Sequence, residues 1–106
     1  MLFMKKVYFD AIRSGEKTTT LRYWRSPRVR AGSVHNIRGL GRVRIDEIAT
    51  VELADLTDAD ARIDGLEDIQ TLRRRLRRLY PPQQRTGRKL YRIRFTFLPA
   101  EAPASD

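Results

Sequence analysis

The stretch from Leu90 to Leu98 constrains the fold most, because its side chains alternate between apolar and polar along its length. The apolar set is Tyr91, Ile93, Phe95 and Phe97, and the polar set is Arg92, Arg94 and Thr96. A period of two predicts a β-strand that buries one face and exposes the other. The chain must therefore build a sheet around this strand.

Three further strands are predicted from β-branched and aromatic residues, over residues 18–24, 33–38 and 41–53. A glycine-bearing turn at residues 38–41 joins the last two. In the long strand Ile48 breaks the apolar parity and Glu47 interrupts the apolar face, which predicts a bend or bulge near Asp46–Ile48. Long bent strands with tight turns are typical of small barrels.

Helices are predicted over residues 4–12, 56–61 and 67–80. The first stops at Ser14-Gly15, and the second has Thr57 as a plausible N-cap. The third is the strongest, and its apolar face comprises Ile69, Leu72, Leu76 and Leu79. Its other faces carry five arginines, which suit either a phosphate-binding surface or a solvated helix.

Composition excludes several classes of function. The 106 residues predict one domain over residues 1–98, followed by a disordered alanine-, proline- and acid-rich tail over residues 99–106. The chain has no cysteine and one histidine, His35, so neither a metal nor a cofactor is expected. His35 suits a general base or, more simply, a surface or barrel-mouth position.

No apolar run approaches the roughly twenty residues of a membrane span. A cytoplasmic protein without membrane contact is therefore expected, and a monomer is compatible with the sequence.

The balance of charge points to a polyanionic partner. Lys and Arg number 22 against 13 Asp and Glu, which gives a net charge of +9. In so small a domain this favours nucleic acid or a nucleotide. Most of the excess is arginine, which binds phosphate in a bidentate manner. Arginine-rich composition also follows from high genomic GC content, and this alternative stays open.

The segment Gly15–Arg22 is the best candidate for a ligand site. Gly15 permits a tight turn and close approach of a ligand. Lys17 has the wrong parity to share a strand face with Thr20 and Arg22, so it is expected in the turn before the strand. Lysine, arginine and threonine side chains in one place suit a phosphate or a polarised carbonyl group.

The residues after this motif extend the candidate site. Trp24 shares the parity of Thr20 and Arg22, and its ring could stack a base or simply pack. Arg25 begins an arginine-dense loop that reaches Gly32, and its guanidinium could hold phosphate or ribose.

Taken together, these motifs resemble the ASCH family of the PUA-like superfamily. The resemblance rests on four segments in order: Gly15-x-Lys17-x-x-x-x-Arg22, Leu56-Thr57-Asp58-Ala59-Asp60-Ala61 with Asp64-Gly65-Leu66, Tyr80-Pro81, and the closing strand that ends in phenylalanine. It implies an α+β fold, a small mixed β-barrel of about five to six strands flanked by two to three helices. It also implies a cleft that binds RNA or a modified nucleoside.

Within that family, the small bacterial N4-acetylcytidine amidohydrolases use Lys, Thr and Glu as their catalytic set. The first two match Lys17 and Thr20, and Asp64 stands at the third position with one methylene less. The resemblance implies that Thr20 attacks the acetyl carbonyl, that Lys17 acts as base or oxyanion stabiliser, and that Asp64 handles protons. Binding of RNA or a modified nucleoside in this cleft is the expected function, hydrolysis of N4-acetylcytidine is the alternative, and metal-independent ribonuclease-like cleavage is a third. Asp64 could also simply cap a turn or the next helix.

Overall fold

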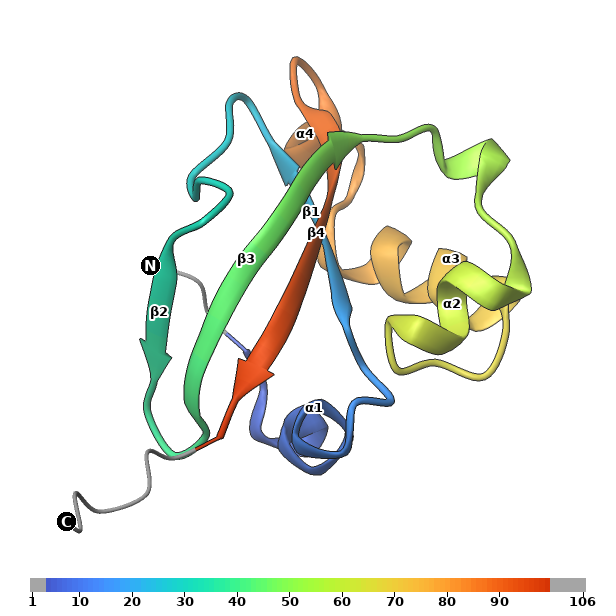
Figure 1. Ribbon diagram of the computed structural model, residues 1–106. Helices are drawn as coiled ribbons and strands as arrows, with labels where there is room; N and C mark the ends of the chain where they lie inside the picture. Colours follow the sequence, from blue (N-terminus) through green and yellow to red (C-terminus); the bar gives the residue numbers. More distant parts are fainter. Residues whose placement is uncertain (1–3, 100–106) are drawn as a thin grey trace, which may run out of the picture.

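The computed structural model describes residues 4–99 and combines a curled four-stranded sheet with short helices (Figure 1). The elements in chain order are η1 (Lys6–Tyr8), α1 (Phe9–Ser14), β1 (Thr19–Trp24), β2 (Val34–Ile37), β3 (Gly41–Thr50), η2 (Leu53–Asp55), α2 (Asp58–Ile63), α3 (Ile69–Leu79), α4 (Pro82–Arg85) and β4 (Lys89–Leu98). The predicted disordered tail lies outside the described residues from residue 100 onward. No helix in the described range is long and apolar enough to cross a membrane.

The sheet has the order β1-β4-β3-β2, and each neighbouring pair is antiparallel. β3 and β4 are its long central strands, and β1 lies at one edge. The register of β3 against β4 shifts between Ile45 and Glu47, as the interrupted apolar face predicted. The sheet therefore curls into half of a barrel (Figure 1).

The described part of the chain confirms an α+β fold and corrects the element counts. It contains four strands, whereas the family resemblance implied about five to six, and all of its strand pairings are antiparallel. It also contains four α-helices rather than two to three. The extra helix, α4, forms in the expected polar loop because Pro82 occupies its first turn, where proline's fixed φ favours helix entry.

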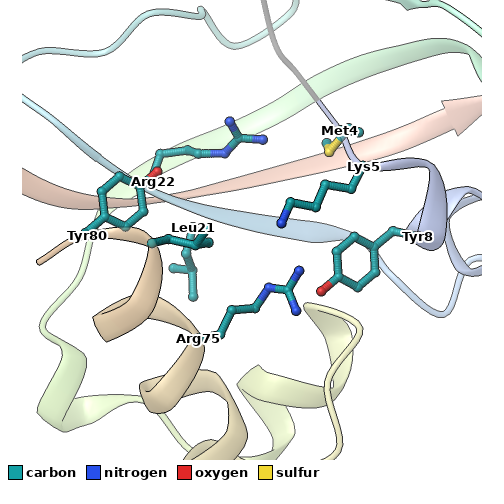
Figure 2. A pocket seen from close by; sticks show the side chains of 8 residues that line it. Met4, Lys5, Tyr8, Leu21, Arg22, Arg75 and Tyr80 are labelled. Carbon is teal, nitrogen blue, oxygen red and sulfur yellow. The ribbon is translucent and has the colours of Figure 1, made fainter.

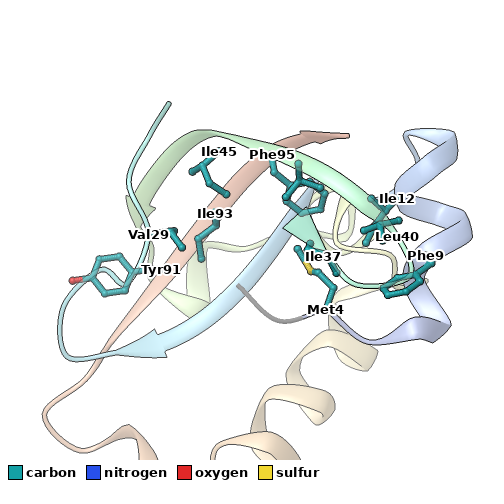
Figure 3. Packing of buried hydrophobic residues seen from close by; sticks show 11 residues of the cluster. Met4, Phe9, Ile12, Val29, Ile37, Leu40, Ile45, Tyr91, Ile93 and Phe95 are labelled. Carbon is teal, nitrogen blue, oxygen red and sulfur yellow. The ribbon is translucent and has the colours of Figure 1, made fainter. Parts of the chain in front are cut away.

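Two hydrophobic clusters lie on opposite faces of β1 and β4. The inward-facing side chains of β4 (Tyr91, Ile93 and Phe95) join Val43 and Ile45 inside the curl (Figure 3). On the outer face, Leu21 and Leu90 pack against Leu72 and Leu76 of α3. The helix α3 consequently covers the outer side of the edge strand β1, where a groove forms between it and the N-terminal segment.

Candidate functional site

The turn that carries Lys17 is fixed by backbone hydrogen bonds to two helices. The Lys17 amide donates to the Ala11 carbonyl at 3.0 Å, and the Thr18 amide donates to the Ile63 carbonyl at 2.8 Å. β1 begins only at Thr19, so Lys17 lies in the turn, as its parity predicted. The turn thereby joins α1 and the end of α2 to the start of the edge strand.

The Lys17 ammonium is buried against Asp64. Its Nζ donates to the backbone carbonyls of Thr19 at 2.7 Å and of Asp64 at 2.5 Å. It also lies 3.7 Å from Asp64 Oδ1, which accepts a hydrogen bond from Thr19 Oγ1 at 3.2 Å. Lys17 and Asp64 are only 4% and 7% exposed. Both charged forms therefore rely on protein groups in place of water.

Burial shifts both groups toward neutrality. Desolvation lowers the pKa of Lys17 despite the nearby Asp64 carboxylate, and Arg22 and Arg75 lower it further. Desolvation raises the pKa of Asp64 from 3.8 to about 6, although Lys17 and the Thr19 hydroxyl oppose the shift. An acid and a base with pKa values displaced in this way are typical of functional sites, and also of structural ion pairs.

Tyr8 covers the buried pair. The Lys17 Nζ lies 4.8 Å from the Tyr8 ring centroid, and the Arg75 guanidinium carbon lies 5.0 Å from the same centroid. Gly65 has φ +93°, and a Cβ at this position would lie 3.2 Å from Lys17 Cδ and 3.4 Å from Tyr8 Cδ1. The glycine that follows Asp64 therefore leaves the space in which the lysine stem and the tyrosine ring pack.

A pocket of about 250 Å³ lies on the other side of Tyr8, between the N-terminal segment, β1 and α3 (Figure 2). Its lining is Met4, Lys5, Tyr8, Leu21, Arg22, Arg75, Leu79 and Tyr80. We call this the edge pocket. Lys17 does not line it, so the buried pair and the pocket are neighbouring parts, and Tyr8 contacts the one and lines the other.

The edge pocket is positively charged and has aromatic walls. Lys5, Arg22 and Arg75 reach it from three different elements, and no acidic residue is among its lining (Figure 2). Burial lowers the pKa of Arg22 and raises that of Tyr8. The Tyr80 ring packs edge-on against Tyr23, with centroids 5.2 Å apart, which fixes its orientation at the pocket wall.

The structure separates the three residues that the resemblance grouped as catalytic. Lys17 and Asp64 come together, but the hydroxyl beside them belongs to Thr19. Thr20 projects from the opposite face of β1 and accepts a hydrogen bond from Arg22 Nε at 3.1 Å. Side chains alternate in direction along a strand, so Thr19 faces Asp64 at the end of α2 and Thr20 points to the other face of β1.

The other predicted binding residues are dispersed. Gly15 caps the end of α1 with φ +85° and has open space around its Cα. Trp24 packs onto the inner cluster with its ring 6.1 Å from Tyr91. Arg25 is exposed at the start of the loop after β1. Of the predicted ligand-binding residues, Arg22 alone lines the edge pocket.

Sequence reasoning missed four polar or aromatic lining residues, namely Lys5, Tyr8, Arg75 and Tyr80. Tyr8 and Arg75 belong to amphipathic segments in which their spacing indicates only a helix face. A signal existed at Arg75, which follows the buried Leu72 by three residues and so borders the packed face of α3. Only the folding of α3 against β1 brings it to the site.

Comparison with known proteins supports the fold and leaves the function open. No family model matches the chain, and no curated protein matches it. The structure is similar to the crystal structure of the hypothetical protein PH0355, with a TM-score of 0.69 over 88% of this chain and 93% of that one. The two sequences are 15% identical, so the likeness concerns the fold alone.

Proposed function

We propose that this protein binds RNA or a modified nucleoside, and that a nucleotide occupies the edge pocket. The observation that carries the proposal is the convergence of Lys5, Arg22 and Arg75 on one pocket with no acidic lining residue. Cations from three elements form a site for a phosphate, because Lys and Arg donate charge-assisted hydrogen bonds to its oxygens. The net charge of +9 favours the approach of such an anion.

The aromatic walls suit a nucleobase. Tyr8 and Tyr80 line the edge pocket, and base–aromatic stacking contributes about 1–3 kcal/mol per base. The volume, about 250 Å³, lies just below the usual range for small-molecule sites, so a single nucleoside fits its scale better than a larger ligand. The likeness of the sequence motifs to the ASCH family supports the same ligand class.

The test is a binding titration with cytidine monophosphate and a short oligoribonucleotide. Replacing Arg75 by Gln is expected to weaken both by about tenfold or more, because a hydrogen bond to a charged group contributes about 1.5–3 kcal/mol. Arg77→Gln removes the same charge from an exposed position on the same helix and is expected to change affinity less than about twofold. Equal losses in the two variants would show nonspecific attraction and refute the pocket.

A second function, hydrolysis of N4-acetylcytidine to cytidine and acetate, is favoured by the buried Lys17–Asp64 pair. The pKa of Asp64, about 6, suits proton transfer near neutral pH, and burial lowers the pKa of Lys17 beside it. A substrate in the edge pocket would reach Lys17 only after Tyr8 moves, since the Tyr8 ring lies over the ammonium. Catalysis therefore requires a rearrangement that binding does not.

Turnover of N4-acetylcytidine distinguishes the two functions. Loss of cytidine release in Lys17→Ala is expected if the pair is catalytic. The matched variants Thr19→Val and Thr20→Val then identify the hydroxyl that the reaction needs, because the two side chains leave β1 on opposite faces. Retained nucleotide binding without turnover in the wild-type protein would exclude the hydrolase.

A further inference from the structure

A second cationic pocket lies at the loop between β1 and β2, away from the edge pocket. It has a volume of about 270 Å³ and is lined by Pro27, Arg28, Val29, Arg30, Ser33 and His35. We call it the loop pocket. The two pockets share no lining residue, and like the edge pocket this one has no acidic side chain in its lining. In Figure 1 the loop and α3 lie on opposite sides of β1.

The loop has a fixed conformation despite its length. Val29 is 5% exposed and joins the inner hydrophobic cluster, so it anchors the middle of the loop. The Gly32 amide donates to the Ile45 carbonyl at 2.7 Å, and the Ile45 amide donates to the Ser33 carbonyl at 2.8 Å. These bonds tie the end of the loop to the central strand β3.

A chain of hydrogen bonds fixes the backbone of Arg30. The Ser33 hydroxyl donates its one proton to the Arg30 carbonyl at 2.5 Å. Its oxygen lies 2.9 Å from His35 Nε2 and, with its own proton already donated, accepts a hydrogen bond from the Nε2–H tautomer. His35 thus holds Ser33, and Ser33 holds the loop at Arg30, which organises the pocket before any ligand arrives.

The two arginines of this loop differ from those on the outer face of the sheet. Arg44 pairs with Asp46, and Arg92 and Arg94 both approach Glu47. Arg28 and Arg30 are exposed, and within residues 4–99 neither side chain has an ion pair or a hydrogen-bond partner. Two guanidinium groups on either side of an anchored residue are thus available to an external anion.

The edge strand connects the two pockets. β1 runs from Arg22, at the edge pocket, through Trp24 directly into this loop. We propose that the loop pocket is a second binding site, in which Arg28 and Arg30 hold a backbone phosphate of a single-stranded RNA, while another nucleotide of the same strand enters the edge pocket. The proposal rests on the proposed function for the identity of the strand.

The test compares a long ligand with a short one. An oligouridylate of about ten residues matches the site size of small single-strand binding domains, and cytidine monophosphate reaches the edge pocket alone. The double variant Arg28→Gln/Arg30→Gln is expected to weaken oligouridylate binding by about tenfold or more. It should also make the slope of log K against log salt shallower by about 1.4, since each lost contact to a single strand removes about 0.7. Affinity for cytidine monophosphate is expected to stay within about twofold of the wild-type value.

The matched control is Arg38→Gln/Arg62→Gln, which removes the same charge from two exposed arginines that line neither pocket. It is expected to retain oligouridylate affinity within about threefold. An equal loss in this control, or an unchanged salt slope in the loop variant, would overturn the proposal. A titration with inorganic phosphate, followed by the amide chemical shifts of the loop, is a further check. If phosphate saturates these shifts at the same concentration as oligouridylate, the loop holds free phosphate and the proposal is overturned.

The two proposals fail in different ways. If the wild-type protein does not bind cytidine monophosphate, and the loop variant binds oligouridylate more weakly than the wild type, the edge pocket is refuted and the loop pocket is supported. If cytidine monophosphate binds and the loop variant retains oligouridylate affinity, the loop pocket is refuted and the proposed function stands.

Discussion

Lys17 and Asp64 illustrate how two charged side chains are accommodated when they are buried. The ammonium has two backbone carbonyls within hydrogen-bond distance, and the carboxylate has the Thr19 hydroxyl. These groups offset part of the desolvation cost, because a buried charge is tolerated only when it is paired and hydrogen-bonded. What remains of that cost appears as the displaced pKa values of both groups.

The raised pKa of Asp64 predicts a pH-dependent stability. Its pKa in the folded protein, about 6, lies above the ordinary value of 3.8. Folding therefore favours the protonated carboxyl, which adds to the free energy of unfolding at low pH. This stabilisation is complete below about pH 3.8 and is lost as pH rises through about 6. Relative to Asp64→Asn, the wild-type free energy of unfolding should fall by about 2–3 kcal/mol over this interval.

Denaturant unfolding at several pH values measures this difference. Titration of the Asp64 carboxyl carbon resonance, assigned by its absence in Asp64→Asn, gives the pKa directly. A midpoint near 4 would contradict the desolvated environment.

Substitution of Gly65 tests the packing of Lys17 against Tyr8. Gly65→Ala should destabilise the protein by more than Gly15→Ala, although both glycines have left-handed φ values of +93° and +85°. Each substitution costs about 1–2 kcal/mol in backbone strain. At Gly65 the new methyl group also presses on Lys17 and Tyr8, whereas Gly15 has nothing within 4 Å.

Thermal unfolding of the two variants isolates the steric part of this effect. The same measurement in Tyr8→Ala/Gly65→Ala should show a smaller loss from the alanine at position 65, since the ring that it meets is gone. An equal cost at positions 15 and 65 would argue against tight packing over the lysine.

At the scale of elements, local patterns predicted much of the chain and little of the site. The alternation in β4, the bulge in β3, the Thr57 cap and the turn position of Lys17 follow from short-range rules, and the structure has all four. The edge pocket depends on α3 crossing β1, which brings Arg75 close to Tyr8 across 67 positions of sequence. No periodicity in the sequence predicts that contact.

The number of strands and the choice of threonine show a limit of the family resemblance. The residues themselves predicted four strands, and the larger number came only from the family resemblance. The assignment of Thr20 also came from that resemblance, whereas the hydroxyl that contacts Asp64 is that of Thr19. A motif transfers residue types, but the face of a strand is decided by where the turn ends and β1 begins.

The cap of α2 supports the site through an element. Thr57 and Asp60 form a reciprocal capping box, with the Thr57 amide donating to Asp60 Oδ2 at 2.8 Å. Thr57→Ala should lower the free energy of unfolding by about 1 kcal/mol, and Thr57→Ser should retain most of it. Because Asp64 is the C-cap of the same six-residue helix, amide exchange at α2 should accelerate in the alanine variant. Unchanged exchange would mean that packing alone holds this helix.

At the scale of the whole molecule, the charge of +9 is unevenly available to a ligand. Carboxylates of Asp46, Glu47 and Asp60 pair with arginines on the outer face of the sheet. The two cationic pockets have no acid in their linings. The edge strand β1 and the loop that follows it therefore carry two pockets whose cations have no acidic neighbour in the lining.

This uneven distribution predicts a moderate salt dependence. Five pocket cations, namely Lys5, Arg22, Arg75, Arg28 and Arg30, should give a slope of log K against log salt of about −3.5 for single-stranded RNA. Participation of most of the 22 basic residues would give a slope several times steeper. Anisotropy titrations over a range of potassium chloride concentrations measure the slope, with Arg44→Gln/Arg94→Gln as a control that should leave it unchanged because both arginines already pair with acids. If this control reduces the slope as much as the loss of Arg28 and Arg30 does, RNA responds to the overall charge of the molecule rather than to the cations along β1.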